Sequence, residues 1–394
     1  MAANLDRRRI TVLLAAFAAV SLGGYLTARA LTKPSMIDMI VYRAEGQAVV
    51  NGTDLYAAVN VRAAAGNLLP ATYPPFAALL FTPLTWVPVG LLRVLVTMAD
   101  VALLAVVVHL SARLVGGRLD RPNTAARWAV IAAVTCGSLW FEPVWTTLRY
   151  GQINLALAAL ILDDLTRPPG GKWRGAAIGI ATGVKLTPAV FIVWFLLSGR
   201  PREAAVSALS ALGTAVIGFV VLPHASLDFW LRQVHDTSKV GKIYITDNQA
   251  LSGVIARMLH LEKPGAAWFV VAALVGIAGL LLAARIARQG DDALGGLCCA
   301  ITGLLISPIS WTHHWVWAVP VVMLLAVRAP RAATAVWALA FCTFLIWAVP
   351  HGKDQELHFN ALQILQSSLY SLAGLAFLLW AWTASTRAQP VTAS

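Results

Sequence analysis

Asp38 is the first residue whose type and position suggest chemistry. It lies in segment 34–56, just past a long apolar run, and Tyr42 follows it at a spacing that would place both on one helical face. A carboxylate where a chain leaves a membrane is costly unless it has a partner or a function. Two interpretations are open. Asp38 caps a helix or pairs with Arg43 or Lys33, or it is a general base that takes a proton from a bound hydroxyl group.

Aromatic and amide side chains that suit sugar binding stand where other apolar runs begin or end. Tyr73 precedes two prolines, Gln152 and Asn154 precede a short apolar segment, and Trp311 precedes two histidines. Each also has an ordinary interpretation. Aromatic rings gather at membrane interfaces, and amides join neighbouring helices by hydrogen bonds.

Basic candidates for holding an anion lie in the same segments. Lys185 separates two short apolar runs, Arg257 follows an amphipathic stretch, and His313 and His314 are adjacent. A lysine at this depth either extends to the interface or meets an anion, for which a phosphate is suitable. Adjacent helical residues point about 100° apart. With no cysteine or HExxH partner nearby, no metal is expected at the histidines.

The composition is typical of a polytopic, all-α membrane protein. Of 394 residues, 59% are hydrophobic and 12% are charged, whereas soluble proteins carry roughly a quarter charged residues. The net charge of +12 does not indicate nucleic-acid binding, because the basic residues lie in short segments between apolar runs. The four cysteines fall within apolar runs and form no metal-binding spacing.

Twelve membrane spans are predicted, because a spanning helix needs about 20 mostly apolar residues. The segment 76–88 contains Pro83 and Pro88 and is predicted to be re-entrant or interfacial. The predicted spans are about 10–31, 90–112, 128–146, 151–165, 175–185, 187–198, 203–223, 264–287, 294–308, 314–328, 331–349 and 361–383.

The charge distribution predicts which side carries the chemistry. With the N-terminus in the cytoplasm, the cytoplasmic segments carry about +10 and the external ones about +3, as the positive-inside rule favours. The long loops 32–75 and 224–263 are then both external. We therefore expect one integral membrane domain, 1–394, in the plasma membrane, with an active site on its external face.

The ordered motifs resemble glycosyltransferase family 87, the polyprenol-phosphate-mannose-dependent α-(1→2)-mannosyltransferases of the mycobacterial phosphatidylinositol mannoside and lipoarabinomannan type. These enzymes have the GT-C fold. The resembling motifs run in order from residue 37 to residue 317: IDMIVYRA, NGTDLY, TYPPFAALLFTPL, GQINLALAALILDD, GVKLTPA, DNQALSGVIAR and SPISWTHHWVW.

The resemblance implies an inverting mannosyltransferase with Asp38 as its base. The donor would be polyprenyl phosphomannose. The acceptor would be a mannosylated phosphatidylinositol lipid or lipomannan/lipoarabinomannan, in contact with membrane lipids. No nucleotide, other cofactor, metal or nucleic acid is expected. The candidate residues for the donor phosphate are Lys185, His313, His314 and Arg257, and those for sugars are Tyr42, Tyr73, Gln152, Asn154 and Trp311.

Two other functions remain open on the sequence. The first is transfer of arabinose or glucose from another polyprenyl phosphosugar, because the spacing of residues does not encode sugar stereochemistry. The second is a transporter or flippase for a lipid-linked sugar. A transporter of this kind would predict interrupted helices related by internal symmetry, and no convincing repeat is visible in the sequence.

Overall fold

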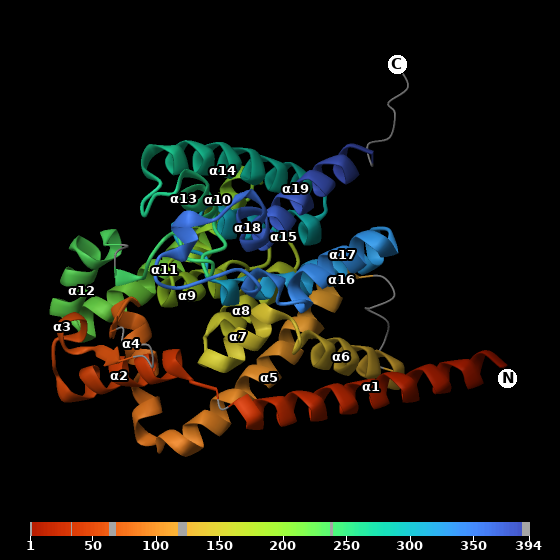
Figure 1. Ribbon diagram of the computed structural model, residues 1–394, viewed down its shortest axis with the longest axis horizontal. Coiled ribbons are helices and arrows are strands. Elements are labelled where there is room, and N and C mark those ends of the chain that lie inside the picture. The colour runs from red at the N-terminus through yellow and green to blue at the C-terminus, as the bar shows by residue number, and fades with distance from the viewer. Residues whose placement is uncertain (1, 33, 63–67, 117–123, 237–238, 388–394) are drawn as a thin grey trace.

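The computed structural model describes residues 2–32, 34–62, 68–116, 124–236 and 239–387, and it is almost entirely helical (Figure 1). Five of its helices are long and apolar enough to cross a membrane. They are α1 (Ala2–Thr32), α5 (Val89–Val115), α11 (Pro201–Val221), α14 (Gly265–Arg288) and α19 (Leu369–Arg387).

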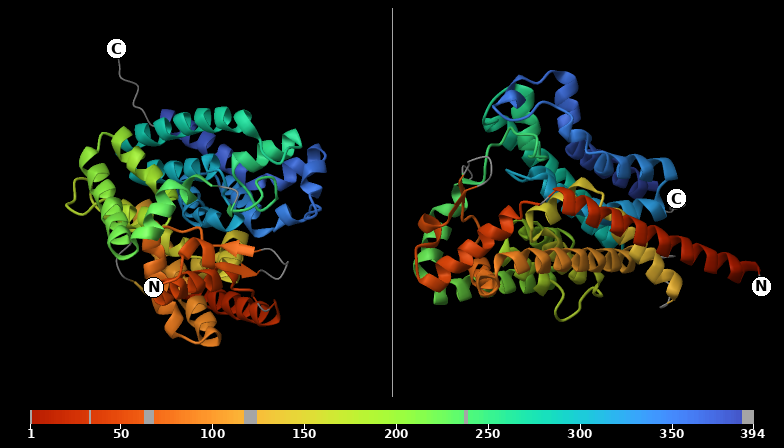
Figure 2. Two further views of the ribbon diagram at one scale, coloured as in Figure 1. Left: turned by 90° about the vertical axis from the view of Figure 1, so that its left-hand side faces the viewer. Right: turned by 60° about the horizontal axis from the view of Figure 1, so that its bottom comes forward.

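The long helices expose apolar side chains in the way that lipid-facing helices do. Val12 and Leu13 on α1 are 66% and 68% exposed, and Leu274 on α14 is 64% exposed. A continuous apolar surface of this kind is unfavourable in water and favourable against lipid tails. α1 and α14 lie on opposite sides of the molecule, with shorter helices between them (Figures 1 and 2).

The predicted span 128–146 is corrected by the structure. It breaks into α6 (Ala125–Ser138) and α7 (Glu142–Tyr150), whose axes differ by 76°. Pro143 stands in the first turn of α7, where a proline begins a helix but cannot continue one from before it. The bent pair passes the length and composition test only if it is counted as one span, giving at most six in the described residues.

The other predicted spans form helices that are too short to cross a membrane alone. They are α8 (Asn154–Thr166), α9 (Ala176–Val184), η3 (Thr187–Ala189) with α10 (Val190–Leu197), α15 (Asp292–Ile306), η6 (Thr312–Trp317) with α16 (Ala318–Arg328), and α17 (Arg331–Cys342). Twelve full-length spans are therefore not found in the described residues.

Much of the two long predicted loops is also helical. The first contains α2 (Ile37–Asn51), α3 (Leu55–Ala58) and an antiparallel pair, β1 (Asn60–Arg62) with β2 (Leu68–Pro70). It leads into α4 (Pro75–Phe81) and η1 (Thr82–Trp86). The second contains α12 (Pro223–Leu231), η4 (Gln233–His235) and α13 (Leu251–Leu259). The remaining elements are η7 (Leu345–Trp347), η8 (Gln355–His358) and α18 (Ala361–Ser367).

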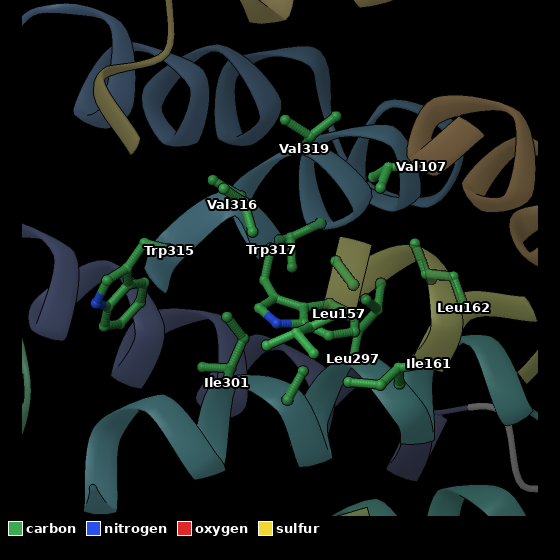
Figure 3. Packing of buried hydrophobic residues seen from close by; sticks show 14 of the residues in the cluster. Val107, Leu157, Ile161, Leu162, Leu297, Ile301, Trp315, Val316, Trp317 and Val319 are labelled. Atoms are coloured by element: carbon green, nitrogen blue, oxygen red, sulfur yellow. The ribbon is translucent and has the colours of Figure 1, made fainter. Parts of the chain in front are cut away.

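The core lies where α8, α15 and η6 meet. Trp317 packs among Leu157 and Leu297, and Trp315 lies near Ile301 (Figure 3). Trp315 is completely buried and Trp317 is 8% exposed. These two tryptophans therefore stabilise the position of η6. Their rings are buried in the core, so they neither lie at a membrane interface nor stack against a bound sugar. α2, α3, α4 and α12 gather at one end of the molecule (Figures 1 and 2).

Candidate active site

Asp38 is held in place by the start of α2. The Met36 N–H donates to the Arg149 carbonyl at the end of α7, over 2.9 Å. Beside this contact, Gly151 has φ +69°, and a Cβ there would lie 2.8 Å from the Met39 Cβ. The tight turn after α7 thus lets α2 approach, and Asp38 stands in the first turn of α2, where the helix dipole favours a negative charge.

The capping and ion-pair interpretations of Asp38 find no support in the described residues. The residue preceding α2 is Met36, and no side chain caps this helix. No ion pair to Asp38 occurs within the described residues, which leave out Lys33. Arg43 instead donates to the Thr85 carbonyl, over 3.2 Å.

Asp38 lines a cavity of about 330 Å³ together with six other residues singled out from the sequence. They are Tyr42, Tyr73, Gln152, Lys185, Trp311 and His314. Five stretches of the chain supply them: α2, the segment before α4, the turn before α8, the turn after α9, and the segment through η6. The volume is sufficient for a sugar with its phosphate.

A chain of hydrogen bonds runs along the wall that carries Asp38. The Tyr42 hydroxyl donates to Gln152 Oε1 over 2.8 Å, and it lies 2.9 Å from the Tyr73 hydroxyl. With its proton given to Gln152, Tyr42 accepts from Tyr73. The Gln152 side chain also hydrogen-bonds Asp38. Two tyrosines and an amide thus fix the orientation of the carboxylate.

Burial raises the pKa of Asp38 to about 6. The hydrogen bond from Gln152 and the positive charge of Lys185 oppose this rise but do not cancel it. A carboxyl group with this pKa is mostly ionised at neutral pH and is a stronger base than an ordinary aspartate.

Lys185 supplies a positive charge to the same cavity. Its Nζ lies 3.0 Å from His314 Nε2, 3.4 Å from Asn154 Oδ1 and 5.6 Å from the centre of the Tyr73 ring. Because an ammonium group only donates, His314 accepts through Nε2 and is therefore neutral. The described residues place no carboxylate within 4 Å of this ammonium. It is therefore available to an anionic ligand.

Two predicted residues lie behind the cavity wall rather than on it. The Asn154 side-chain N–H donates to the His313 carbonyl over 2.9 Å, so its amide joins α8 to η6. The His313 ring is 7% exposed and packs against Tyr150 and His314 at centroid distances of 5.7 and 4.9 Å. Neither of the two residues lines the large cavity.

Arg257 does not line the cavity either. Its guanidinium is completely buried, and it donates to the backbone carbonyls of Tyr244, Ile245 and Asn248. It also donates to the Ser367 carbonyl and to Ser368 Oγ. These contacts tie the segment before α13 to the end of α18, so the structure gives Arg257 a stabilising role away from Lys185.

The cavity also has lining residues that the sequence did not indicate. Thr72, Gln233, Asp236 and Lys239 are among them. Thr72 and Asp236 lie in connecting segments and Gln233 begins the three-residue helix η4, so no hydrophobic periodicity marks them. A metal site is not evident: the described residues contain no group of three His, Cys, Asp or Glu side chains that could hold an ion.

The fold and cavity together define a class: a helical, membrane-type protein whose cavity is lined by a buried carboxylate and by a lysine that forms no direct ion pair within the described residues. This arrangement suits transfer of a group away from an anionic leaving group. The chain belongs to glycosyltransferase family 87, whose family model matches residues 71–308. It is therefore a glycosyltransferase.

Curated relatives cover most of the chain. It is 32% identical to the polyprenol-phosphate-mannose-dependent alpha-(1-2)-phosphatidylinositol mannoside mannosyltransferase of Mycobacterium tuberculosis, over 96% of this chain and 90% of the relative. It is 35% identical to the protein of that name from Mycolicibacterium smegmatis, over 77% and 72%. A pentamannoside mannosyltransferase of M. tuberculosis is 34% identical, over 87% and 81%. No solved structure matches significantly.

Proposed function

We propose that this protein is an inverting mannosyltransferase that moves mannose from polyprenyl phosphomannose to a mannosylated phosphatidylinositol lipid, forming an α-(1→2) linkage. One observation carries the proposal: Asp38 and Lys185 line the same cavity of about 330 Å³. The names of the relatives support the choice of donor and acceptor.

In the proposed reaction, Asp38 accepts the proton of an acceptor mannose hydroxyl as its oxygen attacks the anomeric carbon of the donor. The bond from that carbon to the phosphate oxygen breaks with its electron pair, which leaves polyprenyl phosphate. Attack opposite the phosphate converts a β-linked donor into an α-linked product. Tyr42, Tyr73, Gln152 and Trp311 line the space that the sugars would occupy.

Lys185 and His314 stabilise the leaving phosphate in this proposal. A phosphate that gains charge as its bond breaks needs a nearby positive group more than it needs a strong acid. Lys185 would meet the phosphate oxygens directly, with His314 Nε2 and Asn154 Oδ1 orienting its ammonium. His313 supports this wall from behind, and Arg257 is left out because it does not line the cavity and its terminal nitrogens donate to other groups.

The membrane arrangement that we propose is a GT-C type domain with the N-terminus in the cytoplasm and the cavity on the external side. The external side would then hold α2, α12 and α13, as the charge distribution of the sequence favours. The short helices α8, α9 and α10 would cross only part of the bilayer thickness, buried among longer ones.

A reconstituted assay tests the proposed function. The purified protein is incubated with polyprenyl phosphomannose and a phosphatidylinositol mannoside, and the product is examined by mass spectrometry and by digestion with an α-(1→2)-specific mannosidase. We expect one added hexose that the mannosidase removes. Turnover only with an arabinose or glucose donor, or a product that resists this mannosidase, would contradict the proposal.

A further inference from the structure

Glu45 is a buried carboxylate outside the cavity lining, and the proposed reaction gives it no part. It lies seven residues after Asp38 on α2, on the same face of the helix. It is completely buried. Its Oε1 accepts from the Thr72 N–H over 3.4 Å, and the Tyr73 N–H is close enough to oppose the rise in the pKa of its carboxyl group. Glu45 therefore holds the segment before α4 through the backbone.

Tyr56 holds the same segment from the other side. Its hydroxyl donates to the Tyr73 carbonyl over 2.8 Å. Tyr56 belongs to α3, whose start is fixed by Asp54, which accepts from the Tyr56 and Ala57 N–H groups. The Tyr73 carbonyl is thus bonded to α3, and the N–H of the preceding residue, Thr72, is bonded to α2.

Tyr73 is the residue through which these bonds reach the cavity. Its hydroxyl lies 2.9 Å from the Tyr42 hydroxyl, which continues to Gln152 and Asp38. The face of its ring lies 5.6 Å from the Lys185 ammonium. A shift of Tyr73 would therefore disturb the orientation of Asp38 and of Lys185 together.

We propose that Glu45 is a positioning residue that acts with Tyr56 to hold Tyr73, and through Tyr73 sets the geometry between Asp38 and Lys185. The inference rests on the proposed function for the roles of Asp38 and Lys185. Misplacement of a reacting group by about 1 Å can cost on the order of a hundredfold in rate, so a backbone clamp of this kind has a measurable effect.

Glu45 acts in its neutral form. No ion pair to it occurs within the described residues. Burial raises its pKa to about 8, although the Thr72 and Tyr73 N–H groups oppose the rise. The titratable groups that interact with its charge are Tyr56 and Tyr73. Other ionisable residues on α2 and on the elements packed against it are Asp38, Tyr42, Arg43, Arg62, Glu142, Arg149 and Tyr150.

Three variants test the inference with the full-length enzyme and polyprenyl phosphomannose. Glu45→Gln keeps an acceptor of the same shape, Glu45→Ala removes it, and Gln47→Ala is a control on the same helix whose side chain contacts Asn51. We expect Glu45→Ala to lower kcat at least about tenfold, with Glu45→Gln and Gln47→Ala within about threefold of wild type. Equal loss in Glu45→Gln and Glu45→Ala, or wild-type kcat in folded Glu45→Ala, would overturn the inference.

A stability measurement separates this inference from the proposed function. Between about pH 4.5 and about pH 8 the folded protein keeps a proton on Glu45 that the unfolded chain releases. The folded-to-unfolded ratio of wild type therefore falls by up to about tenfold per pH unit from this group. Glutamine does not titrate, so the Tm of Glu45→Gln should rise relative to wild type from pH 5 to pH 8. A constant difference in Tm would contradict a neutral Glu45, whichever donor sugar the enzyme uses.

Discussion

Asp38 and Lys185 meet opposite electrostatic demands within one cavity. Asp38 needs to be basic enough to take a proton, and its burial raises the pKa to about 6. Lys185 needs to keep its ammonium, although burial lowers its pKa to about 8, and the negative charge of Asp38 opposes that fall without a direct ion pair. His314 Nε2 and Asn154 Oδ1 accept its hydrogen bonds. A carboxylate in direct contact with Lys185 would neutralise the ammonium and weaken its attraction for a phosphate.

Replacement of Asp38 by asparagine tests the base. We expect Asp38→Asn to lower kcat by about 10²-fold or more, because an amide cannot accept the proton, while binding of the donor is nearly unchanged. Asp163→Asn is the control, since Asp163 pairs with Arg167 at a partly exposed site. Near wild-type turnover in Asp38→Asn would remove Asp38 from the mechanism.

The rate should also depend on pH with a defined sign. The base works when ionised, and burial raises the pKa of Asp38 to about 6. Wild-type kcat/KM should therefore fall by up to about tenfold per pH unit as the pH is lowered below 6. It should also begin to fall near pH 8, because burial lowers the pKa of Lys185 to about 8 and the proposed mechanism needs its ammonium. A pH profile from 4.5 to 8 measures this. A flat acid limb down to pH 4.5 would contradict the raised pKa.

Replacement of Lys185 tests the cation. We expect Lys185→Met to raise the donor KM or lower kcat/KM by at least about tenfold, since a hydrogen bond to a charged group contributes about 1.5–3 kcal/mol. Lys239→Met is a matched control, because Lys239 lines the same cavity but is exposed and bonded to Gln233. If both variants lose activity to the same extent, the effect comes from the overall positive potential of the cavity and not from Lys185 in particular.

At the scale of elements, α2 is the part that determines the site. It contributes Asp38 and Tyr42 to the cavity, and Glu45 to the clamp on Tyr73. Its docking depends on Gly46, where a Cβ would lie 2.5 Å from the Phe81 carbonyl oxygen. No flexible side chain is available to move aside at that contact, because the neighbouring atoms belong to the backbone where α4 passes into η1.

Gly46→Ala is therefore expected to displace α2. We expect a loss of about 1–3 kcal/mol of stability, as for other overpacked sites, together with reduced turnover because Asp38 moves with the helix. Gly90→Ala is the control, since a Cβ at Gly90 meets nothing within 4 Å. Thermal unfolding and kcat of the two variants give the comparison, and equal values for both would contradict the tight contact.

The sequence predicts the long apolar helices but not the lengths of the short helices or the break between two of them, for a physical reason. Long apolar runs such as α5 and α14 are visible because a spanning helix must be apolar along its whole length. The sequence predicts spans at α6 with α7 and at the short helices α8, α9 and α10, because these segments are apolar. It does not show that polar partners from other segments permit helices shorter than a lipid-facing span needs. The helices within the first long loop are shorter than a span, so the search for apolar runs of spanning length does not mark them.

At the scale of the whole molecule, the orientation in the membrane decides which compartment supplies the substrates. Asn51 and Gln289 are both exposed, on segments that the charge distribution assigns to opposite sides. We expect a membrane-impermeant maleimide to label Asn51→Cys in intact cells and Gln289→Cys only after permeabilisation. Three of the four native cysteines are buried, so the wild-type background should be low. Labelling of Gln289→Cys in intact cells would contradict the proposed orientation of the protein in the membrane.

The sequence by itself determined the membrane class, the family resemblance and the residues able to act as base, cation and sugar contacts. Only the tertiary structure decided which of them meet. The Tyr42–Gln152 bond joins residues 110 positions apart, and Lys185 and His314 are 129 positions apart. Arg257 and Lys185 look alike as basic residues beside apolar runs, yet the terminal nitrogens of Arg257 bond mainly to backbone carbonyls away from the cavity, whereas Lys185 lines the cavity. The burial of a side chain and its hydrogen-bond partners depend on contacts between segments that are distant in the sequence, so no local sequence pattern predicts them.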